Sequence, residues 1–380
     1  AQGHFERQLI PQVTIQLSAK YQYSCSLYLD PVYLGSLGKE ENFYHQQEGY
    51  LNAGVLYNVL HCLSFSFNTD GIISALNADL QDFAKPVRYQ WLTSVSGKYV
   101  NSWLVASATA LFTLVDEKVQ SGNASKGYFR VNPFVSATFK PFNKINLRFR
   151  VFYKNIFRLP TFNDLYYGRV GNINLKPEST NQYNIGVTYQ AYLADFLPKV
   201  MLSCDVYHNS VKDKIVAYPT KNIYTWTMLN YGKVSINGLD FSGEVAVKPH
   251  SKVMILLGAS YTYNQAVNVT DPNSSDYKHQ IPYTPRISGS GRASLQTPWV
   301  DINYSLVWSG HRYAVNQNYA ENRVEGFFDH SISASHDFII KRHLLGINLE
   351  CLNITNKNYA VVRYFPMPGR SWRATVYWKF

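Results

Sequence analysis

The chain ends in the stretch SWRATVYWKF, Ser371 to Phe380. Apolar and polar side chains alternate along it without exception, and the apolar set is Trp372, Ala374, Val376, Trp378 and Phe380. Because successive side chains of a β-strand point to opposite faces, the pattern predicts a strand with one apolar and one polar face. Transmembrane β-barrels are built from such strands with aromatics at the membrane interfaces, so we expect Trp372, Trp378 and Phe380 to belong to a closing strand and its girdle. A soluble sheet that buries its apolar face is the alternative, and one strand does not decide between them.

Earlier stretches repeat this alternation and place basic residues in the polar phase. Between residues 144 and 154, apolar side chains alternate with Lys, Asn and Arg, and Arg148 and Arg150 share the polar phase. A Lys or Arg that faces lipid near the membrane midplane costs about 2 to 4 kcal/mol, so the basic phase must face the inside of a barrel. We therefore predict that Arg148, Arg150 and Arg158 face the lumen.

Turn-forming residues divide the chain into strands joined alternately by short and long connections. The short ones are 58–61, 99–102, 141–144, 196–199, 249–252, 297–298 and 341–343, and the long ones are 22–48, 69–87, 116–126, 155–181, 209–222, 264–280, 310–325 and 355–370. Outer-membrane barrels combine short periplasmic turns with long extracellular loops, and the division gives about sixteen strands. The predicted fold is an all-β transmembrane antiparallel β-barrel that occupies residues 1–380 as one domain, with both ends on the periplasmic side.

Composition argues against other classes of protein. Phe, Tyr and Trp make up 15% of the 380 residues, whereas disordered chains are poor in aromatics. Helical membrane proteins need apolar runs of about 18 residues, and the sequence has none. The net charge of +11 comes from basic residues that alternate with apolar ones, so no nucleic-acid partner is predicted. Residues 1–6 lack a signal-peptide pattern, and we expect that processing removed one or that the chain is part of a longer one.

Two short segments resemble the paired motifs of TonB-dependent outer-membrane receptors. The first is FRLP followed by TFNDLYYG, residues 157–168, and the second is NINLKPE, residues 172–178. Leu159 and Ile173 stand where the family pattern has Ala and Pro. The segments 353–359 and 367–370 are similar to the family's C-terminal region, and residues 213–217, 226, 230, 232 and 236–240 look like receptors of Bacteroides-type bacteria. The resemblance covers most of the chain from residue 129 onward.

The resemblance implies a location in the outer membrane of a Gram-negative bacterium. A full receptor of this family has a segment that engages the TonB energy-transducing complex, an N-terminal plug domain and a barrel of about 22 strands. The chain then corresponds to the C-terminal part of the barrel, without the plug. Implied partners are the TonB complex, the plug and the missing strands, outer-membrane lipid including lipopolysaccharide, and a large nutrient. Arg148, Arg150, Arg158 and Glu178 are expected to face that plug across the lumen.

Two functions of different classes remain open. One is TonB-coupled uptake of a scarce large nutrient, either cobalamin or an iron-siderophore or other metal chelate, and the Bacteroides-type resemblance favours cobalamin. The other is a passive porin of about sixteen strands. No enzyme is predicted, because the carboxylate pair Asp164 and Glu178 and the pair His279 and Asp276 lack the motifs that surround catalytic groups. No cofactor and no metal site are predicted.

The long connections concentrate aromatic and basic residues. A large ligand captured at low concentration needs rigid amphipathic contacts, which Tyr and Trp supply, while Arg can pair with anionic groups. The predicted ligand-binding residues are Tyr166, Tyr167, Tyr224, Trp226, Arg312, Tyr313, Arg363 and Tyr364. For each of them, a place in the aromatic girdle at the membrane interface is an equally open alternative.

Overall fold

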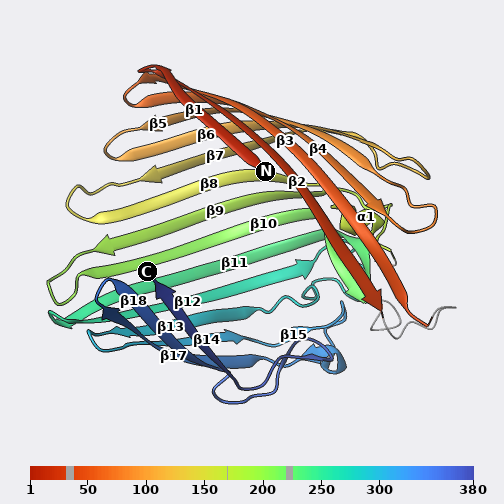
Figure 1. The fold of residues 1–380 in the computed structure, drawn as a ribbon. Coiled ribbons are helices and arrows are strands. Elements are labelled where there is room, and N and C mark those ends of the chain that lie inside the picture. Colours follow the sequence, from red (N-terminus) through yellow and green to blue (C-terminus); the bar gives the residue numbers. More distant parts are fainter. Residues whose placement is uncertain (31–37, 169, 220–225) are drawn as a thin grey trace. The chain divides into compact units, whose positions relative to one another are not determined.

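The computed structural model describes residues 1–30, 38–168, 170–219 and 226–380 and consists almost entirely of β-strands (Figure 1). Seventeen strands belong to one sheet, and the neighbouring strands from β1 to β6 and from β11 to β21 pair in antiparallel register. Two further sheets have two short strands each. No helix of the described ranges has the length and apolar character needed to cross a membrane. The predicted all-β antiparallel class is confirmed.

The described residues form two compact units. The first comprises residues 1–137, 152–182 and 212–231, and the second comprises 138–151, 183–211 and 232–380. The first unit contains β1 (Gln2–Ile10), β2 (Val13–Asp30), β3 (Glu40–Leu60), β4 (Leu63–Ala78), β5 (Val87–Val100), β6 (Leu104–Lys118) and α1 (Phe162–Tyr166). The strands β7 (Tyr128–Phe139), β8 (Asn146–Arg158), β9 (Glu178–Ala191), β10 (Lys199–Pro219) and β11 (Trp226–His250) have residues in both units.

The second unit contains the remaining elements. They are β12 (Val253–Asn268), β13 (Ile287–Gln296), β14 (Asp301–Ser309), β15 (Arg312–Tyr313), η1 (Ala320–Asn322), β16 (Arg323–Val324), β17 (Phe327–Ile340), β18 (His343–Leu352), β19 (Ala360–Val362), β20 (Phe365–Pro366) and β21 (Ser371–Lys379). Strands β15 and β16 pair with each other, as do β19 and β20, inside the long connections that follow β14 and β18. These two small hairpins are therefore part of the loop structure and not of the large sheet.

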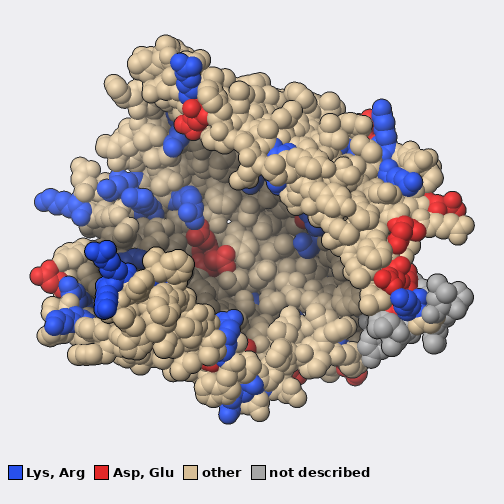
Figure 2. All heavy atoms as spheres, in the orientation of Figure 1, with Lys and Arg blue, Asp and Glu red and all other residues tan. Residues whose placement is uncertain are grey.

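The apolar face of the first unit is exposed. The register places Leu51 opposite Gly71, Gly71 opposite Trp91, and Trp91 opposite Leu114. Leu51, Trp91 and Leu114 are 67%, 56% and 55% exposed, whereas a soluble sheet would bury its apolar face. Figure 2 accordingly shows broad stretches of surface without charged side chains. An exposed apolar strand face is the arrangement of a membrane barrel.

The other face of the same strands is polar and internally hydrogen-bonded. Asp70 accepts hydrogen bonds from Tyr50 at 2.8 Å and from Asn52 at 2.7 Å. The closing strand β21 repeats the division in the second unit, where Trp372 and Trp378 are 76% and 60% exposed. Its polar phase pairs with neighbouring strands, because Arg373 bonds to a carboxylate of β18. The alternation read from the last ten residues is confirmed.

Among the described residues, the large sheet has seventeen strands, one more than the predicted number of about sixteen. Pro11 and Gln12 form a tight turn between β1 and β2, which the sequence prediction missed although proline is a turn former. Because of this turn, Ala1 lies beside Tyr21 of β2 and not among the short turns, so the prediction that both ends lie on the periplasmic side is wrong for the N-terminus. Several strands also run farther than expected. β2 and β3 pair as far as Asp30 and Glu40, inside a stretch predicted to be a long connection, because polar cross-strand contacts such as Tyr23 to His45 at 2.7 Å continue the ladder.

Candidate functional site

The first motif segment forms a strand end and a single helical turn. Strand β8 ends at Arg158, and Thr161 caps α1. The Thr161 Oγ1 accepts a hydrogen bond from the Asp164 backbone N–H at 3.1 Å, and the Asp164 carboxylate accepts one from the Thr161 N–H at 2.9 Å. This reciprocal capping box satisfies two backbone donors that a helix start leaves free. The motif residues therefore define where the chain leaves the sheet.

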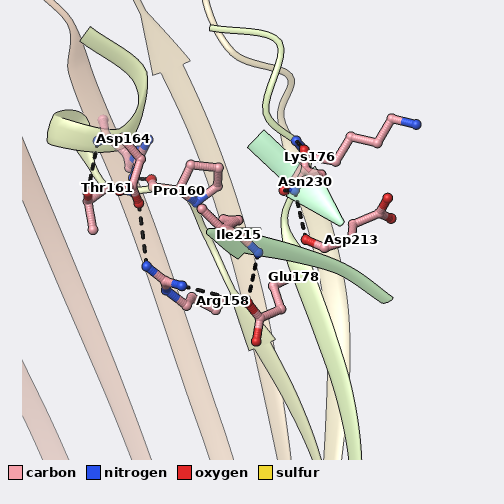
Figure 3. Close-up of polar contacts among 10 residues, drawn as sticks. Arg158, Pro160, Thr161, Asp164, Lys176, Glu178, Asp213, Ile215 and Asn230 are labelled. Atoms are coloured by element: carbon pink, nitrogen blue, oxygen red, sulfur yellow. Dashed lines mark hydrogen bonds and ion pairs between the residues drawn. The ribbon is translucent and has the colours of Figure 1, made fainter. Parts of the chain in front are cut away.

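Arg158 joins the two motif segments. Its guanidinium lies 3.5 Å from the Asp164 carboxylate and 3.6 Å from the Glu178 carboxylate (Figure 3). The Arg158 side chain is 46% exposed, and the two carboxylate side chains are 10% and 13% exposed. Glu178 also accepts a hydrogen bond from the Ile215 backbone N–H at 3.1 Å. One cation thus ties the end of β8, the start of α1, the start of β9 and a segment of β10 together.

Asn230 ties the second motif segment to the same region of β10. Its side-chain amide donates to the backbone oxygens of Lys176 at 2.9 Å and Asp213 at 2.7 Å, and its Oδ1 accepts from the Lys176 N–H at 2.8 Å (Figure 3). Asn172 acts in parallel, because its side chain donates to the Met228 backbone oxygen at 2.9 Å. Sequence reasoning marked these residues as family-like, but it did not reveal that they bond to one another.

Helix α1 packs against the polar face of the first unit through a buried ion pair. The Arg88 Nε lies 2.7 Å from the Glu117 carboxylate, and their side chains are 8% and 0% exposed. Arg88 also donates to the Pro160 backbone oxygen at 2.8 Å and lies over the Phe162 ring at 4.8 Å. The Tyr166 hydroxyl donates to Glu117. Burial and this carboxylate raise the pKa of Tyr166 well above its ordinary value, so the phenol stays protonated.

An aromatic cluster continues this contact. Phe162, Tyr44 and Leu76 are each at most 5% exposed and form a small core, and the rings of Tyr44 and Tyr167 stack with centroids 4.5 Å apart. Sequence reasoning missed Arg88, Glu117 and Tyr44. The one available signal was that Arg88 and Glu117 each occupy a polar position in an otherwise alternating strand, and this does not predict that they pair.

The predicted ligand-binding residues fall in different environments. In the first unit, Tyr166 and Tyr167 pack against strands as described, and Trp226 begins β11. Tyr224 lies outside the described residues. In the second unit, Tyr364 is 55% exposed, and the Arg363 guanidinium lies 5.0 Å from its ring centre. The Tyr313 backbone oxygen accepts from the Tyr283 N–H at 2.8 Å.

Arg312 is buried and holds two loops together. It is 3% exposed, and its guanidinium donates to the backbone oxygens of Val361 at 3.0 Å and Glu325 at 3.4 Å, and to that of Ala360. Its charged group also lies 5.6 Å from the Phe327 ring centre. Burial lowers the pKa of Arg312. The side chain therefore faces loop carbonyls and not solvent, which gives it a positioning role that the sequence did not reveal.

The residues predicted to face the lumen have partners within the polar face. Arg150 pairs with Asp205, and the Arg148 Nε donates to the Asn146 side chain at 3.1 Å. The girdle residues Trp372, Trp378 and Phe380 are exposed. Among the residues that the structure describes, no three or more His, Cys, Asp or Glu side chains lie together as metal ligands. The contacts at the motif junction are suited to holding loops and to offering hydrogen bonds, and the Arg158 side chain is about half exposed.

The TonB dependent receptor-like, beta-barrel family matches residues 86–356, a range that includes both motif segments and the residues that join them. The chain belongs to this family. Its large antiparallel sheet is thus that of a TonB-dependent receptor barrel. The family consists of receptors and transporters of the Gram-negative outer membrane and not of enzymes.

Two curated relatives are vitamin B12 transporters called BtuB. The transporter of Vibrio vulnificus is 36% identical over 84 residues, which cover 22% of this chain and 13% of that protein. The transporter of Photobacterium profundum is 24% identical over 228 residues, 59% of this chain and 34% of that protein. The matched regions are therefore a minor part of both transporters.

Solved structures show the same fold at low sequence identity. The copper transporter OprC superposes with a TM-score of 0.76 at 12% identity, over 99% of this chain and 63% of OprC. BauA, the ferric preacinetobactin receptor of Acinetobacter baumannii, superposes with a TM-score of 0.74 at 11% identity, over 99% of this chain and 61% of BauA. The chain thus spans less than two thirds of these receptors, and the likeness concerns the fold alone.

Proposed function

We propose that the protein takes up a scarce, large nutrient across the outer membrane and that uptake is driven through the TonB complex. The observation that carries the proposal is the junction of the two motif segments at Arg158 inside a barrel of this family. The plug domain and the segment that engages TonB belong to the rest of the receptor in this proposal. Nucleic acid and cofactors have no part in it.

Cobalamin is the proposed nutrient, and an iron-siderophore or other metal chelate is the second candidate. Two relatives are named as vitamin B12 transporters, which supports cobalamin. BauA is named as a ferric preacinetobactin receptor and OprC as a copper transporter, which supports the second class. Both kinds of ligand are too large and too dilute for diffusion through a general pore to suffice.

Ligand contact is proposed for the accessible members of the predicted set. Tyr364 and Arg363 present an exposed ring with a cation beside it. Ligand contact is proposed for Trp226 and Tyr224 from their place in the sequence alone. Aromatic and Arg side chains at such positions supply large contact area and charge-assisted hydrogen bonds. Arg312 is proposed to act on the ligand only through the loops that it holds. Tyr166 and Tyr167 are proposed to fix α1.

The test is uptake by a Gram-negative host that lacks its own cobalamin receptor. The full-length receptor should restore uptake of labelled cobalamin at limiting concentration, and loss of functional TonB should abolish it. Tyr364→Ala and Arg363→Ala should weaken binding, while Lys357→Ala, in the same connection, serves as the control. Entry of small solutes that persists without TonB would support the passive porin instead. If an iron chelate is taken up with TonB and cobalamin is not, the proposed nutrient is wrong, but the proposed TonB-driven uptake still holds.

A further inference from the structure

Two tyrosines in the long connections of the second unit have backbone conformations that tyrosine rarely adopts. Tyr283 has a φ of 53° and Tyr364 has a φ of 68°. A bulky residue is strained in this left-handed region, because its Cβ comes too close to a backbone oxygen. Such strain persists only where surrounding contacts hold it, and it collects at functional sites. Both tyrosines are therefore candidates for a role that glycine or asparagine could not fill.

Tyr364 is the second residue of a two-residue hairpin turn. Val362 pairs with Phe365 across β19 and β20, so Arg363 and Tyr364 form the turn between them. Glycine or asparagine is the usual residue where a tight turn requires a positive φ. The Tyr364 ring is 55% exposed, and the Arg363 guanidinium lies 5.0 Å from its centre. The turn thus presents an aromatic ring and a cation at a position where glycine would fold with less strain.

Tyr283 connects a second loop to this turn. Its hydroxyl is hydrogen-bonded to the Arg363 backbone, and its N–H donates to the Tyr313 backbone oxygen at 2.8 Å. The buried Gln280 side chain fixes the next residue, because its amide donates to the Thr284 backbone oxygen at 3.1 Å. These contacts hold Tyr283 in its left-handed conformation and place its hydroxyl against the turn that carries Arg363.

Arg363 has no carboxylate partner in the part of the chain that the structure describes. Arg312, the other cation near Tyr283, is buried and donates to loop carbonyls. A guanidinium beside an exposed ring is suited to bind a ligand oxygen that carries negative charge, and phosphate matches its fork of donors best. The turn therefore offers its charge to a ligand and not to another loop.

We propose that Tyr283 is a positioning residue for ligand binding, because it holds the turn so that Arg363 binds the phosphate of cobalamin while the Tyr364 ring contacts the rest of the ligand. This inference rests on the proposed function, which supplies the nutrient. Tyr283 acts through the Arg363 backbone and does not itself bind the phosphate.

The test measures cobalamin binding by the full-length receptor in detergent, together with the unfolding temperature of the same protein. Tyr283→Phe keeps the ring and the strained backbone but loses the hydroxyl, and affinity should fall about fivefold. Tyr283→Asn loses the ring as well, and affinity should fall about twentyfold. Asn adopts the left-handed conformation more readily than Phe, so Tyr283→Asn should unfold at a higher temperature than Tyr283→Phe. A residue with a merely structural role would lose affinity and stability in the same order.

Lys278→Asn is the matched control, because Lys278 lies in the same connection, is exposed and has a φ of 62°. It should relieve similar strain and leave cobalamin affinity unchanged. Arg363→Gln tests the ligand group. It should weaken the binding of cobalamin about tenfold and that of cobinamide, which lacks the phosphate, much less.

Unchanged cobalamin affinity in both Tyr283 variants would overturn the positioning role, and so would a loss of affinity that follows the loss of stability. An equal effect of Arg363→Gln on the two ligands would overturn the assignment of the phosphate. With a wild type that binds cobalamin, these outcomes leave the proposed function intact. A wild-type receptor that binds neither cobalamin nor cobinamide would refute both the proposed nutrient and this inference.

Discussion

Two charge pairs, one from the polar face of each unit, differ in how far they are exposed to water. In the first unit, the Arg88 and Glu117 side chains are 8% and 0% exposed, and α1 covers them. In the second unit, Arg292 pairs with Glu244, and their side chains are 65% and 37% exposed. A covered pair has lost its water and depends on its partner, whereas an open pair keeps much of its hydration. The same pair of charged groups therefore contributes differently to stability in the two places.

The open pairs of the second unit need room, and glycine supplies it. Arg292 on β13 crosses Gly258 on β12 to reach Glu244 on β11, and a Cβ at Gly258 would lie 2.7 Å from the Arg292 Nε. Two other long side chains cross a glycine in the same way to reach an acid two strands away: Arg150 crosses Gly186 to Asp205, and Tyr377 crosses Gly346 to Asp337. The buried pair is stabilised because α1 covers it. The exposed pairs can form because a glycine on the strand between them leaves space for the long side chain.

The largest effect is expected for the covered pair. Arg88→Met leaves the Glu117 carboxylate buried without its cation and removes the hydrogen bond to Pro160, so it should destabilise the barrel by about 3 to 5 kcal/mol. The measurement is the temperature at which the folded band is lost on a heat-modifiability gel. Arg148→Met, at an exposed position, should change little. The double variant Arg88→Met, Glu117→Leu should recover most of the loss, and failure to recover would mean that the covering helix, and not the charge pair, determines the effect.

A smaller effect is expected at the motif junction. Asn230→Ala removes three hydrogen bonds to Lys176 and Asp213, and the expected destabilisation is about 1.5 kcal/mol because the site is partly hydrated. Hydrogen exchange at the Lys176 amide should accelerate. Asn174→Ala, an exposed residue of the same segment, is the control. If exchange at Lys176 stays unchanged, the junction is held by Arg158 instead.

The open pairs should be less sensitive still. Gly258→Val places a side chain where Arg292 lies and should break the Arg292 to Glu244 contact, at about 0.5 kcal/mol for an exposed pair. Gly291→Val is the matched control, since a Cβ there meets only the Leu306 Cβ at 3.9 Å. Thermal stability of the two variants is compared with the wild type. Equal losses would show that strand glycine itself, and not the crossing side chain, is what matters.

The last prediction concerns pH dependence and involves Tyr359, whose hydroxyl donates to Asp329. Burial and this carboxylate raise the pKa of Tyr359 to about 12, above its ordinary value near 10. The folded state therefore holds the proton more tightly than the unfolded state. The resulting stability is complete below about pH 10 and is lost as the pH rises from about 10 through about 12. Thermal unfolding of the wild type and Tyr359→Phe across this range should reveal a steeper decline in the wild type, and identical profiles would contradict the assignment.

The sequence by itself determined the two-faced strands, because alternation at a period of two is a property of neighbouring residues and needs no tertiary information. It also located the two motif segments, whose residues stand together in the chain. It did not reveal the turn at Pro11 and Gln12, where a single proline breaks two strands that share one alternating pattern. Strand ends beyond the expected membrane span were missed for a related reason, since polar hairpins and polar loops have the same composition.

Tertiary structure alone decided which residues meet. Arg88 and Glu117 stand opposite each other in the register of β5 and β6, and Tyr166 joins them only because α1 returns to the polar face. From the sequence, Arg312 was expected to be an exposed cation in a loop. In the structure it is buried and bonds to backbone oxygens of a second loop. Glycines such as Gly258 had no visible role until the register placed a long side chain above them. The strand register decides which side chains meet across two strands, and the folding back of the chain decides which meet between two loops. The local alternation of apolar and polar residues gives neither kind of information.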